Sequence, residues 1–202
     1  AHRGVERVVL VDLDEGVTSL ARDLPGLRDL NRGALSDPRV TVVNDDAMRW
    51  LDERPGVFDL VIVDFPDPAS FAVGKLYTTR FYALVAGALA PDGVVAVQAT
   101  SPLHARRSFW CIVRTMEAAG FATRPYRTFV PSFRGDWGFV LASRRALPIP
   151  DHVLEGTRSL DAASVAAMFV LPPDLARVDG EVNRLDNQAL VRLYEEEVRS
   201  WN

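Results

Sequence analysis

The sequence is short of cysteine, of long apolar runs and of clustered basic residues, and each shortage excludes a class of protein. It has 202 residues and one cysteine, Cys111, so no disulfide can form within the chain and a reducing compartment fits. No apolar run approaches the ~20 residues that a membrane-spanning helix needs, and no signal peptide is visible. The net charge of −4 comes without a basic block, which argues against a nucleic-acid surface.

Histidine is also scarce. The three histidines, His2, His104 and His152, show no metal-ligand spacing, so we predict no metal site. Cys111 lies in an apolar helical pattern and is interpreted as a small buried residue. The chain begins at Ala1 rather than at a methionine, and we expect it to be part of a longer protein.

What remains is an ordinary globular composition, with 48% hydrophobic and 25% charged residues. Short β-branched runs alternate with helical patterns, which predicts a parallel sheet with helices on both faces. The expected strands are 8–11, 40–43, 60–63 and 94–97, and the expected helices are 15–24, 47–53, 81–89 and 105–119. Residues 123–130 and 138–142 follow as an antiparallel hairpin. The fold class is therefore α/β, an open and mostly parallel sheet with a C-terminal hairpin.

A second region follows the predicted sheet. Residues 146–158 read as a polar linker, and helices are expected near 161–169 and over 186–201. The last helix has Asp186 as its expected N-cap and an apolar stripe that includes Tyr194. We therefore divide the chain into a core, 1–145, and a linker with a helical appendage, 146–202.

Carboxylates follow three of the predicted strands. The run from Phe58 to Val63 reads as a buried parallel strand, and Asp64 and Asp67 come directly after it among prolines. The two earlier strands end in acidic pairs, Asp12 with Asp14 and Asp45 with Asp46. One acidic strand end is often only a helix N-cap. Three in register indicate a ligand site, because open α/β sheets bind ligands beyond the carboxyl ends of their strands.

Each position suits a different part of a nucleoside ligand. Asp12 is placed to accept hydrogen bonds from ribose hydroxyls. Asp46 is placed to accept from an exocyclic amine such as that of adenine, and Asp64 and Asp67 would face the reacting group. This order is typical of the Rossmann-like, methyltransferase-type nucleoside fold at least as much as of a dehydrogenase.

The motifs also resemble a known family, the spermidine synthases or polyamine aminopropyltransferases. The segment Asp64-Phe65-Pro66-Asp67-Pro68 is similar to the family's Asp-x-x-Asp-Pro signature, and Leu76-Tyr77 and Phe81-Tyr82 follow as they do there. Further segments match in order and extend the resemblance over about residues 5–145; they are 11–14, 45–47, 97–98, 130–133 and 137–139. The tail resembles the bacterial branch whose full-length proteins carry membrane helices before the synthase domain.

The sequence departs from the family pattern in three places. The Gly-rich loop and the strand before it are absent, and we expect them just upstream of residue 1. In the family's topology that strand lies between the predicted strands 8–11 and 60–63, so we expect the fragment alone to be inactive. Phe65-Pro66 replaces a small polar pair, and Ala47 replaces a glycine.

The resemblance implies transfer of an aminopropyl group from decarboxylated S-adenosylmethionine to a diamine such as putrescine. It assigns Asp64 as the general base and Asp67 as the anchor of a cationic group, with Tyr77 and Gln98 as further amine ligands. Asp12 and Asp46 would hold the nucleoside co-substrate. It implies no prosthetic group, a homodimer and a position on the cytoplasmic side, with the inner membrane reached only through upstream segments.

Two other functions stay open on the residues alone. An S-adenosylmethionine-dependent methyltransferase would use the same scaffold and the same Asp12 and Asp46 sites. A non-catalytic binding or assembly module is the third hypothesis. The presence of both Asp64 and Asp67 favours an enzyme acting on a cationic amine. The diamine itself is not fixed by the sequence.

Overall fold

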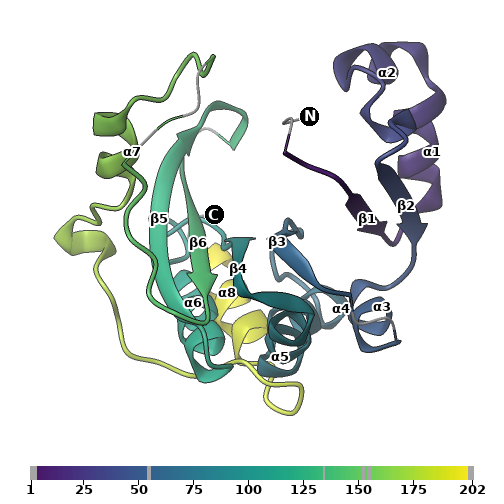
Figure 1. The fold of residues 1–202 in the computed structure, drawn as a ribbon. Coiled ribbons are helices and arrows are strands. Elements are labelled where there is room, and N and C mark those ends of the chain that lie inside the picture. Colours follow the sequence, from purple (N-terminus) through teal and green to yellow (C-terminus); the bar gives the residue numbers. More distant parts are fainter. Residues whose placement is uncertain (1–3, 54–55, 134, 152, 154–155, 200–202) are drawn as a thin grey trace. The chain divides into compact units, whose positions relative to one another are not determined.

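The strands of the chain form two separate sheets (Figure 1). The computed structural model describes residues 4–53, 56–133, 135–151, 153 and 156–199. The chain divides into an N-terminal unit, Ala1–Pro55, and a C-terminal unit, Gly56–Asn202. Each unit is described by itself.

The N-terminal unit is built on a parallel pair of strands, β1 (Val8–Asp12) and β2 (Val40–Asn44), in register from Val8↔Val40 to Asp12↔Asn44. Parallel neighbours need a crossover connection, which here contains two short helices and one 3₁₀ turn. These are α1 (Glu15–Asp23), α2 (Pro25–Leu30) and η1 (Ala34–Ser36), and α3 (Ala47–Glu53) follows β2.

The C-terminal unit holds a four-stranded sheet in the order β3-β4-β6-β5. Its strands are β3 (Phe58–Val63), β4 (Leu89–Gln98), β5 (Ala122–Val130) and β6 (Gly135–Ser143). β3 pairs with β4 in parallel, and β6 is antiparallel to both β4 and β5. Three strands of this sheet therefore run one way and β6 runs the other, which confirms the predicted mostly parallel sheet with an antiparallel C-terminal hairpin.

Helices cover both faces of this sheet, as predicted. Alternate residues of a strand face opposite sides. On β5, Thr123 donates a hydrogen bond to Glu117 of helix α6 (Arg106–Ala118), whereas the ring of Tyr126 lies against Phe169, directly after helix α7 (Ala162–Met168). Because these two strand residues have opposite parity, α6 and α7 lie on opposite faces of β5.

The remaining elements of the C-terminal unit are short helices and turns and two longer helices. They are α4 (Phe71–Gly74), η2 (Lys75–Tyr77), α5 (Thr79–Ala88), η3 (Pro131–Phe133), η4 (Pro173–Leu175) and α8 (Ala189–Arg199). The core lies between the sheet and helices α5, α6 and α8. Its largest fully buried side chains are Tyr77, Tyr82, Phe81, Phe109, Ile112, Met116 and Leu190.

Most of the predicted elements are confirmed, and three details differ. Strand β3 is parallel but is buried on one face only: Leu60 and Ile62 share the other face and are 55% and 70% exposed, whereas Val63 is 3% exposed. Helix α8 begins at Ala189 rather than after Asp186, since Gln188 has a positive φ of 46° that interrupts the helical backbone. Strand β4 starts at Leu89, so it is longer at its beginning than the predicted strand 94–97.

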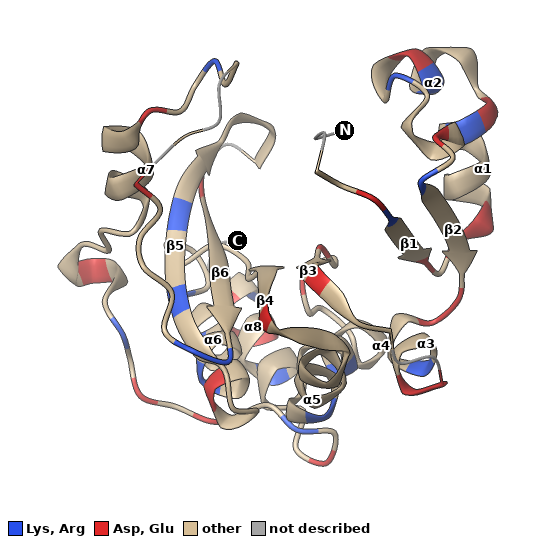
Figure 2. Ribbon diagram, in the orientation of Figure 1, with Lys and Arg blue, Asp and Glu red and all other residues tan. Residues whose placement is uncertain are grey.

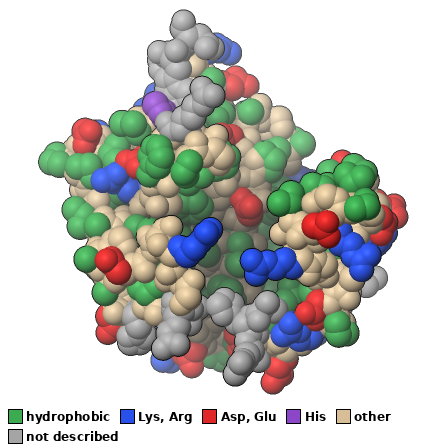
Figure 3. Space-filling model, turned by 90° about the horizontal axis from the view of Figure 1, so that it is seen from above, with side chains coloured by type: hydrophobic (Ala, Val, Ile, Leu, Met, Phe, Trp, Pro, Cys, Tyr) green, Lys and Arg blue, Asp and Glu red, His purple; other side chains and the backbone are tan. Residues whose placement is uncertain are grey.

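The surface carries charges of both signs and exposed apolar side chains. Figure 2 shows acidic and basic residues distributed over both units, and Figure 3 shows them interspersed with apolar side chains on one face. None of the helices within the described ranges is both long and apolar enough to cross a membrane. The predicted appendage residue Trp201 lies outside the described residues.

Candidate active site

The two carboxylates predicted to bind a nucleoside both lie at the carboxyl end of the N-terminal parallel pair. Asp12 is the last residue of β1, and Asp46 follows β2 by two residues. Both are half-buried. Asp12 Oδ1 accepts a hydrogen bond from the backbone N–H of Asp14 at 2.8 Å, which fixes the carboxylate at the strand end.

Two of the acidic residues at these strand ends, Asp14 and Asp46, cap helices. Asp14 is the N-cap of α1, where its Oδ1 accepts from the N–H groups of Gly16 and Val17. Asp46 caps α3 in the same way, and its Oδ1 accepts from Met48 N–H at 2.9 Å. The capping interpretation therefore holds for Asp14, and for one oxygen of Asp46, while Asp12 caps no helix.

In the C-terminal unit, Asp64 and Gln98 lie side by side at the carboxyl ends of two neighbouring parallel strands. Val63 of β3 is paired with Val97 of β4, and Asp64 and Gln98 are the next residues in each strand direction. Adjacent strands lie ~4.8 Å apart, so the two side chains start from neighbouring positions. Asp64 is exposed, and Gln98 is half-buried.

Tyr77 and Gln98 hold the backbone of the loop between Asp64 and Asp67. Tyr77 Oη donates to the carbonyls of Phe65 and Pro66, each at 3.2 Å, and Gln98 Nε2 donates to the carbonyl of Phe65 at 3.0 Å. Tyr77 is only 1% exposed. Burial raises its pKa, and the charges of Asp67 and Asp64 raise it further, so Tyr77 is a neutral hydrogen-bond donor near these carboxylates.

This geometry bears on how Tyr77 and Gln98 would serve an amine. Both stay predicted amine ligands, because the loop uses only their hydrogen-bond donors. Gln98 Oε1 and the hydroxyl oxygen of Tyr77 remain acceptors, and only an acceptor suits an ammonium group. The structure therefore brings Asp64, Asp67, Tyr77 and Gln98 together, with Tyr77 acting on the loop itself.

Asp67 has one satisfied and one unsatisfied oxygen. Its Oδ2 accepts a hydrogen bond from Tyr194 Oη at 2.7 Å. Its Oδ1 is buried and has no hydrogen-bond partner among the described residues. A buried acceptor without a partner costs ~1–3 kcal/mol, and no lysine or arginine of the described chain forms an ion pair with Asp64 or Asp67. The site is thus able to accept a cationic hydrogen-bond donor.

Sequence reasoning missed two residues that shape this part of the site. Tyr194 was counted with the apolar stripe of the last helix, but its hydroxyl reaches Asp67. Asn183 is 1% exposed, and its Nδ2 donates to the carbonyls of Gly74 and Tyr77 at 3.0 and 3.1 Å. The position of a polar tip on an otherwise apolar helix face was the available signal for Tyr194, and a buried asparagine carries none in the sequence.

Phe65 and Cys111 have structural roles. The ring of Phe65 lies edge-on to those of Phe81 and Tyr77, at centroid distances of 5.5 and 6.2 Å, so Phe65 is part of the core packing. Cys111 is buried, and burial raises its pKa to about 11, so it is a neutral thiol. Within the ranges that the structure describes, no group of three His, Cys, Asp or Glu side chains is placed to hold a metal ion.

Comparison with known proteins agrees with this geometry. A family model described as "Spermine/spermidine synthase domain" matches residues 1–149. A polyamine aminopropyltransferase of Leptospira interrogans is 45% identical over 201 residues, which are 100% of this chain and 40% of that protein. Polyamine aminopropyltransferase 2 of Ralstonia nicotianae is 50% identical over 195 residues, 96% of this chain and 38% of that protein. The chain therefore spans about 40% of the length of these relatives.

Solved structures give the same result. The crystal structure of spermidine synthase from Thermotoga maritima superposes with a TM-score of 0.71 at 28% identity, over 85% of this chain and 59% of that one. A spermidine synthase in complex with the transition-state analogue AdoDATO superposes with a TM-score of 0.74 at 28% identity, over 85% and 60% of the two chains.

Proposed function

Because the chain belongs to the spermine/spermidine synthase domain family, we propose that the protein containing it transfers an aminopropyl group. The donor is decarboxylated S-adenosylmethionine and the acceptor is a diamine such as putrescine. The products are spermidine, or a related polyamine, and methylthioadenosine. Residues 1–145 form the catalytic core of this proposal, and 146–202 its helical appendage.

The observation that carries the proposal is the pair of carboxylates at the end of β3. Asp67 Oδ1 is a buried acceptor whose partner is not among the described residues, and Asp64 lies exposed three residues before it. A diamine at neutral pH brings cationic N–H donors, which satisfy such oxygens with charge-assisted hydrogen bonds. A neutral methyl acceptor brings no positive charge to offset two carboxylates.

The two carboxylates have separable tasks in this reaction. Asp64 accepts a proton from the attacking ammonium, which frees the nitrogen lone pair. The nitrogen then attacks the methylene carbon bound to the sulfonium, so that a C–N bond forms while the C–S bond breaks and its electron pair goes to sulfur. Asp67 holds a cationic end of the substrates in place. Asp64 is exposed and passes its proton to water.

Positioning is the main requirement of this displacement, because the sulfonium is already a good leaving group. Holding both reactants in line can remove ~7–11 kcal/mol from such a barrier. The bonds from Tyr77 and Gln98 to the loop carbonyls support this task, since they fix the backbone that carries both carboxylates. Asp12 and Asp46 are proposed to hold the ribose and the adenine of the nucleoside.

Product analysis with two donors tests the proposal. The intact protein is incubated with putrescine and either decarboxylated S-adenosylmethionine or S-adenosylmethionine, and products are identified by mass spectrometry. We expect equal amounts of spermidine and methylthioadenosine, and only with the decarboxylated donor. S-adenosylhomocysteine from the second donor would indicate the methyltransferase instead, and no product from either would indicate a binding module. A homodimer and a cytoplasmic position stay predictions.

A further inference from the structure

The C-terminal helix α8 contributes a hydrogen-bond donor to the amine side of the candidate site. Tyr194 Oη lies 2.7 Å from Asp67 Oδ2, although the two residues are 127 positions apart in the chain. Tyr194 is half-buried. Burial raises its pKa, and the hydrogen bond to Asp67 raises it further, so the phenol keeps its proton and acts as a donor at neutral pH.

We propose that Tyr194 is a positioning residue for Asp67, which makes helix α8 part of the diamine-binding site. The inference rests on the proposed function. A carboxylate can rotate about its Cβ–Cγ bond, and a hydrogen bond to one oxygen fixes that rotation. Since Tyr194 occupies Oδ2, the buried Oδ1 of Asp67 is the oxygen left to accept from a substrate ammonium.

The hydroxyl of Tyr194 is held in place because α8 is fixed on both sides of it. Before the helix, Asn183 Oδ1 accepts from the N–H of Leu190 at 3.2 Å, and its Nδ2 reaches the carbonyls of Gly74 and Tyr77. Leu190 is fully buried. The start of α8 is therefore bonded to the same segment that carries Tyr77.

After Tyr194, the helix is bonded to the start of α6. Glu197 accepts from the backbone N–H of Arg107 at 2.7 Å and of Ser108 at 3.0 Å, and from Ser108 Oγ at 2.6 Å. These N–H groups belong to the first turn of α6, which has no side-chain cap of its own. A carboxylate from α8 thus caps α6, and the macrodipole of α6 favours its charge.

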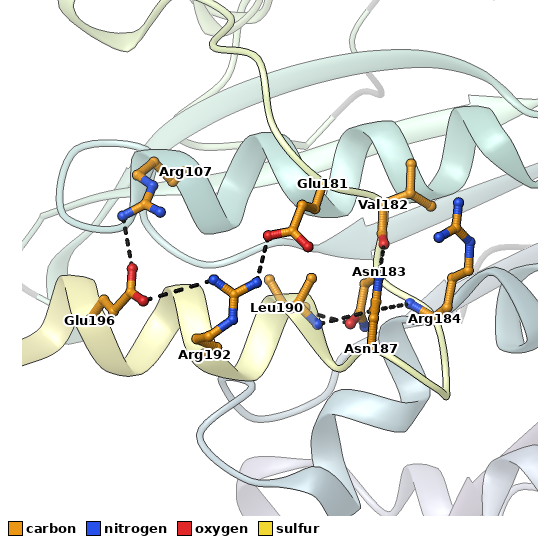
Figure 4. A network of polar contacts seen from close by, with 10 residues as sticks. Arg107, Glu181, Val182, Asn183, Arg184, Asn187, Leu190, Arg192 and Glu196 are labelled. Carbon is orange, nitrogen blue, oxygen red and sulfur yellow. Dashed lines mark hydrogen bonds and ion pairs between the residues drawn. The ribbon is translucent and has the colours of Figure 1, made fainter.

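A row of charges runs between these two anchors. Arg192 of α8 pairs with Glu181 at 2.5 Å and faces Glu196, which in turn pairs with Arg107 at 3.0 Å (Figure 4). These side chains are about half exposed, so each pair contributes little stability.

The decisive variant is Tyr194→Phe, which keeps the ring and removes only the hydroxyl. Tyr82→Phe is the matched control, because Tyr82 Oη is buried but has no hydrogen-bond partner within the described chain. A hydrogen bond to a charged group has a net value that corresponds to about ten-fold or more. We therefore expect Tyr194→Phe to raise the KM for the diamine about ten-fold, with kcat and the KM for the nucleoside donor changed less than about three-fold. Tyr82→Phe should leave all three unchanged.

A double-mutant cycle separates positioning from packing. If Tyr194 acts through Asp67, adding Tyr194→Phe to Asp67→Asn should raise the diamine KM by less than about two-fold more, because the two changes remove one interaction. Additive effects, an effect of Tyr194→Phe equal to that of Tyr82→Phe, or an equal loss in all three constants would overturn the proposal.

Calorimetry with methylthioadenosine present measures diamine binding without turnover. Weaker diamine binding to Tyr194→Phe than to Tyr82→Phe supports the positioning role. If the unaltered protein binds the diamine but makes no spermidine, only the proposed reaction is contradicted. Equal binding in an active enzyme would contradict only the role of Tyr194. No diamine binding by the unaltered protein would contradict both.

Discussion

Replacing Asn183 with alanine should loosen the attachment of the C-terminal segment to the rest of its unit. Asn183 is 1% exposed, and its side chain bonds to three backbone groups, which are the carbonyls of Gly74 and Tyr77 and the N–H of Leu190. Alanine leaves all three without this partner. Water reaches so buried a position poorly, so the lost bonds are not replaced.

The expected cost follows from these three groups. A buried polar group that loses its partner costs ~1–3 kcal/mol. The two carbonyls share one amide group as their donor, so we take the cost for each of the three groups at the lower end of that range, about 1 kcal/mol. The free energy of unfolding should therefore fall by about 3 kcal/mol. Because ~1.4 kcal/mol is a factor of ten, amides of α8 should exchange with solvent about 100-fold faster.

The matched control is Asn187→Ala. Asn187 also makes three side-chain hydrogen bonds, to the N–H groups of Arg184 and Ala189 and the carbonyl of Val182, but it is exposed. Water can replace those bonds, so this change should cost about 1 kcal/mol or less. Urea unfolding and hydrogen exchange of the intact variants measure both effects. If the two substitutions lower the free energy of unfolding equally, the burial of Asn183 does not increase the cost of losing its hydrogen bonds, and the prediction is wrong.

Two further predictions concern the nucleoside carboxylate and a surface ion pair. Asp12→Ala should weaken methylthioadenosine binding by ~1–3 kcal/mol while diamine binding stays nearly unchanged, and equal losses in calorimetry would remove Asp12 from the nucleoside site. The hydrogen bond from Arg177 lowers the pKa of Glu117 below its ordinary 4.5. The stabilisation from this pair is therefore present above pH 4.5 and is lost as the pH falls through the lowered pKa. Arg177→Ala should cost ~0.2–1 kcal/mol at neutral pH, since both side chains are partly exposed, and less in acid; a cost in urea unfolding that does not depend on pH would contradict the assignment.

Local signals in the sequence were sufficient for most of the fold. β-Branched runs gave β1, β2 and the centre of β4, because such residues suit strands wherever they pack. The helix α7 was predictable from Asp161, which forms a capping box with Ser164. The antiparallel hairpin of β5 and β6 followed from the short connection between them.

What the sequence did not reveal depends on tertiary contacts. Ile62 is as apolar as a core residue, but it lies with Leu60 on the exposed face of β3, whereas Val63 lies on the buried face. Helical periodicity placed Tyr194 on the buried face of α8, and it could not identify a partner 127 residues away. Tyr77 was predicted as a site residue, but only the structure shows that its hydroxyl bonds to the loop carbonyls. Sequence patterns predict which face is buried, and they do not predict which polar atoms meet there.

The most direct test of the proposed reaction is the turnover of Asp64→Asn in the intact protein. Asparagine keeps the size of the side chain and cannot accept the proton, and Asp64 is exposed at the end of β3, so the fold should be preserved. Loss of a general base typically costs ~10²–10⁴-fold in rate. We expect methylthioadenosine release to fall by that factor, with methylthioadenosine affinity unchanged. Turnover within about three-fold of the unaltered enzyme would contradict the assignment of Asp64 as the base.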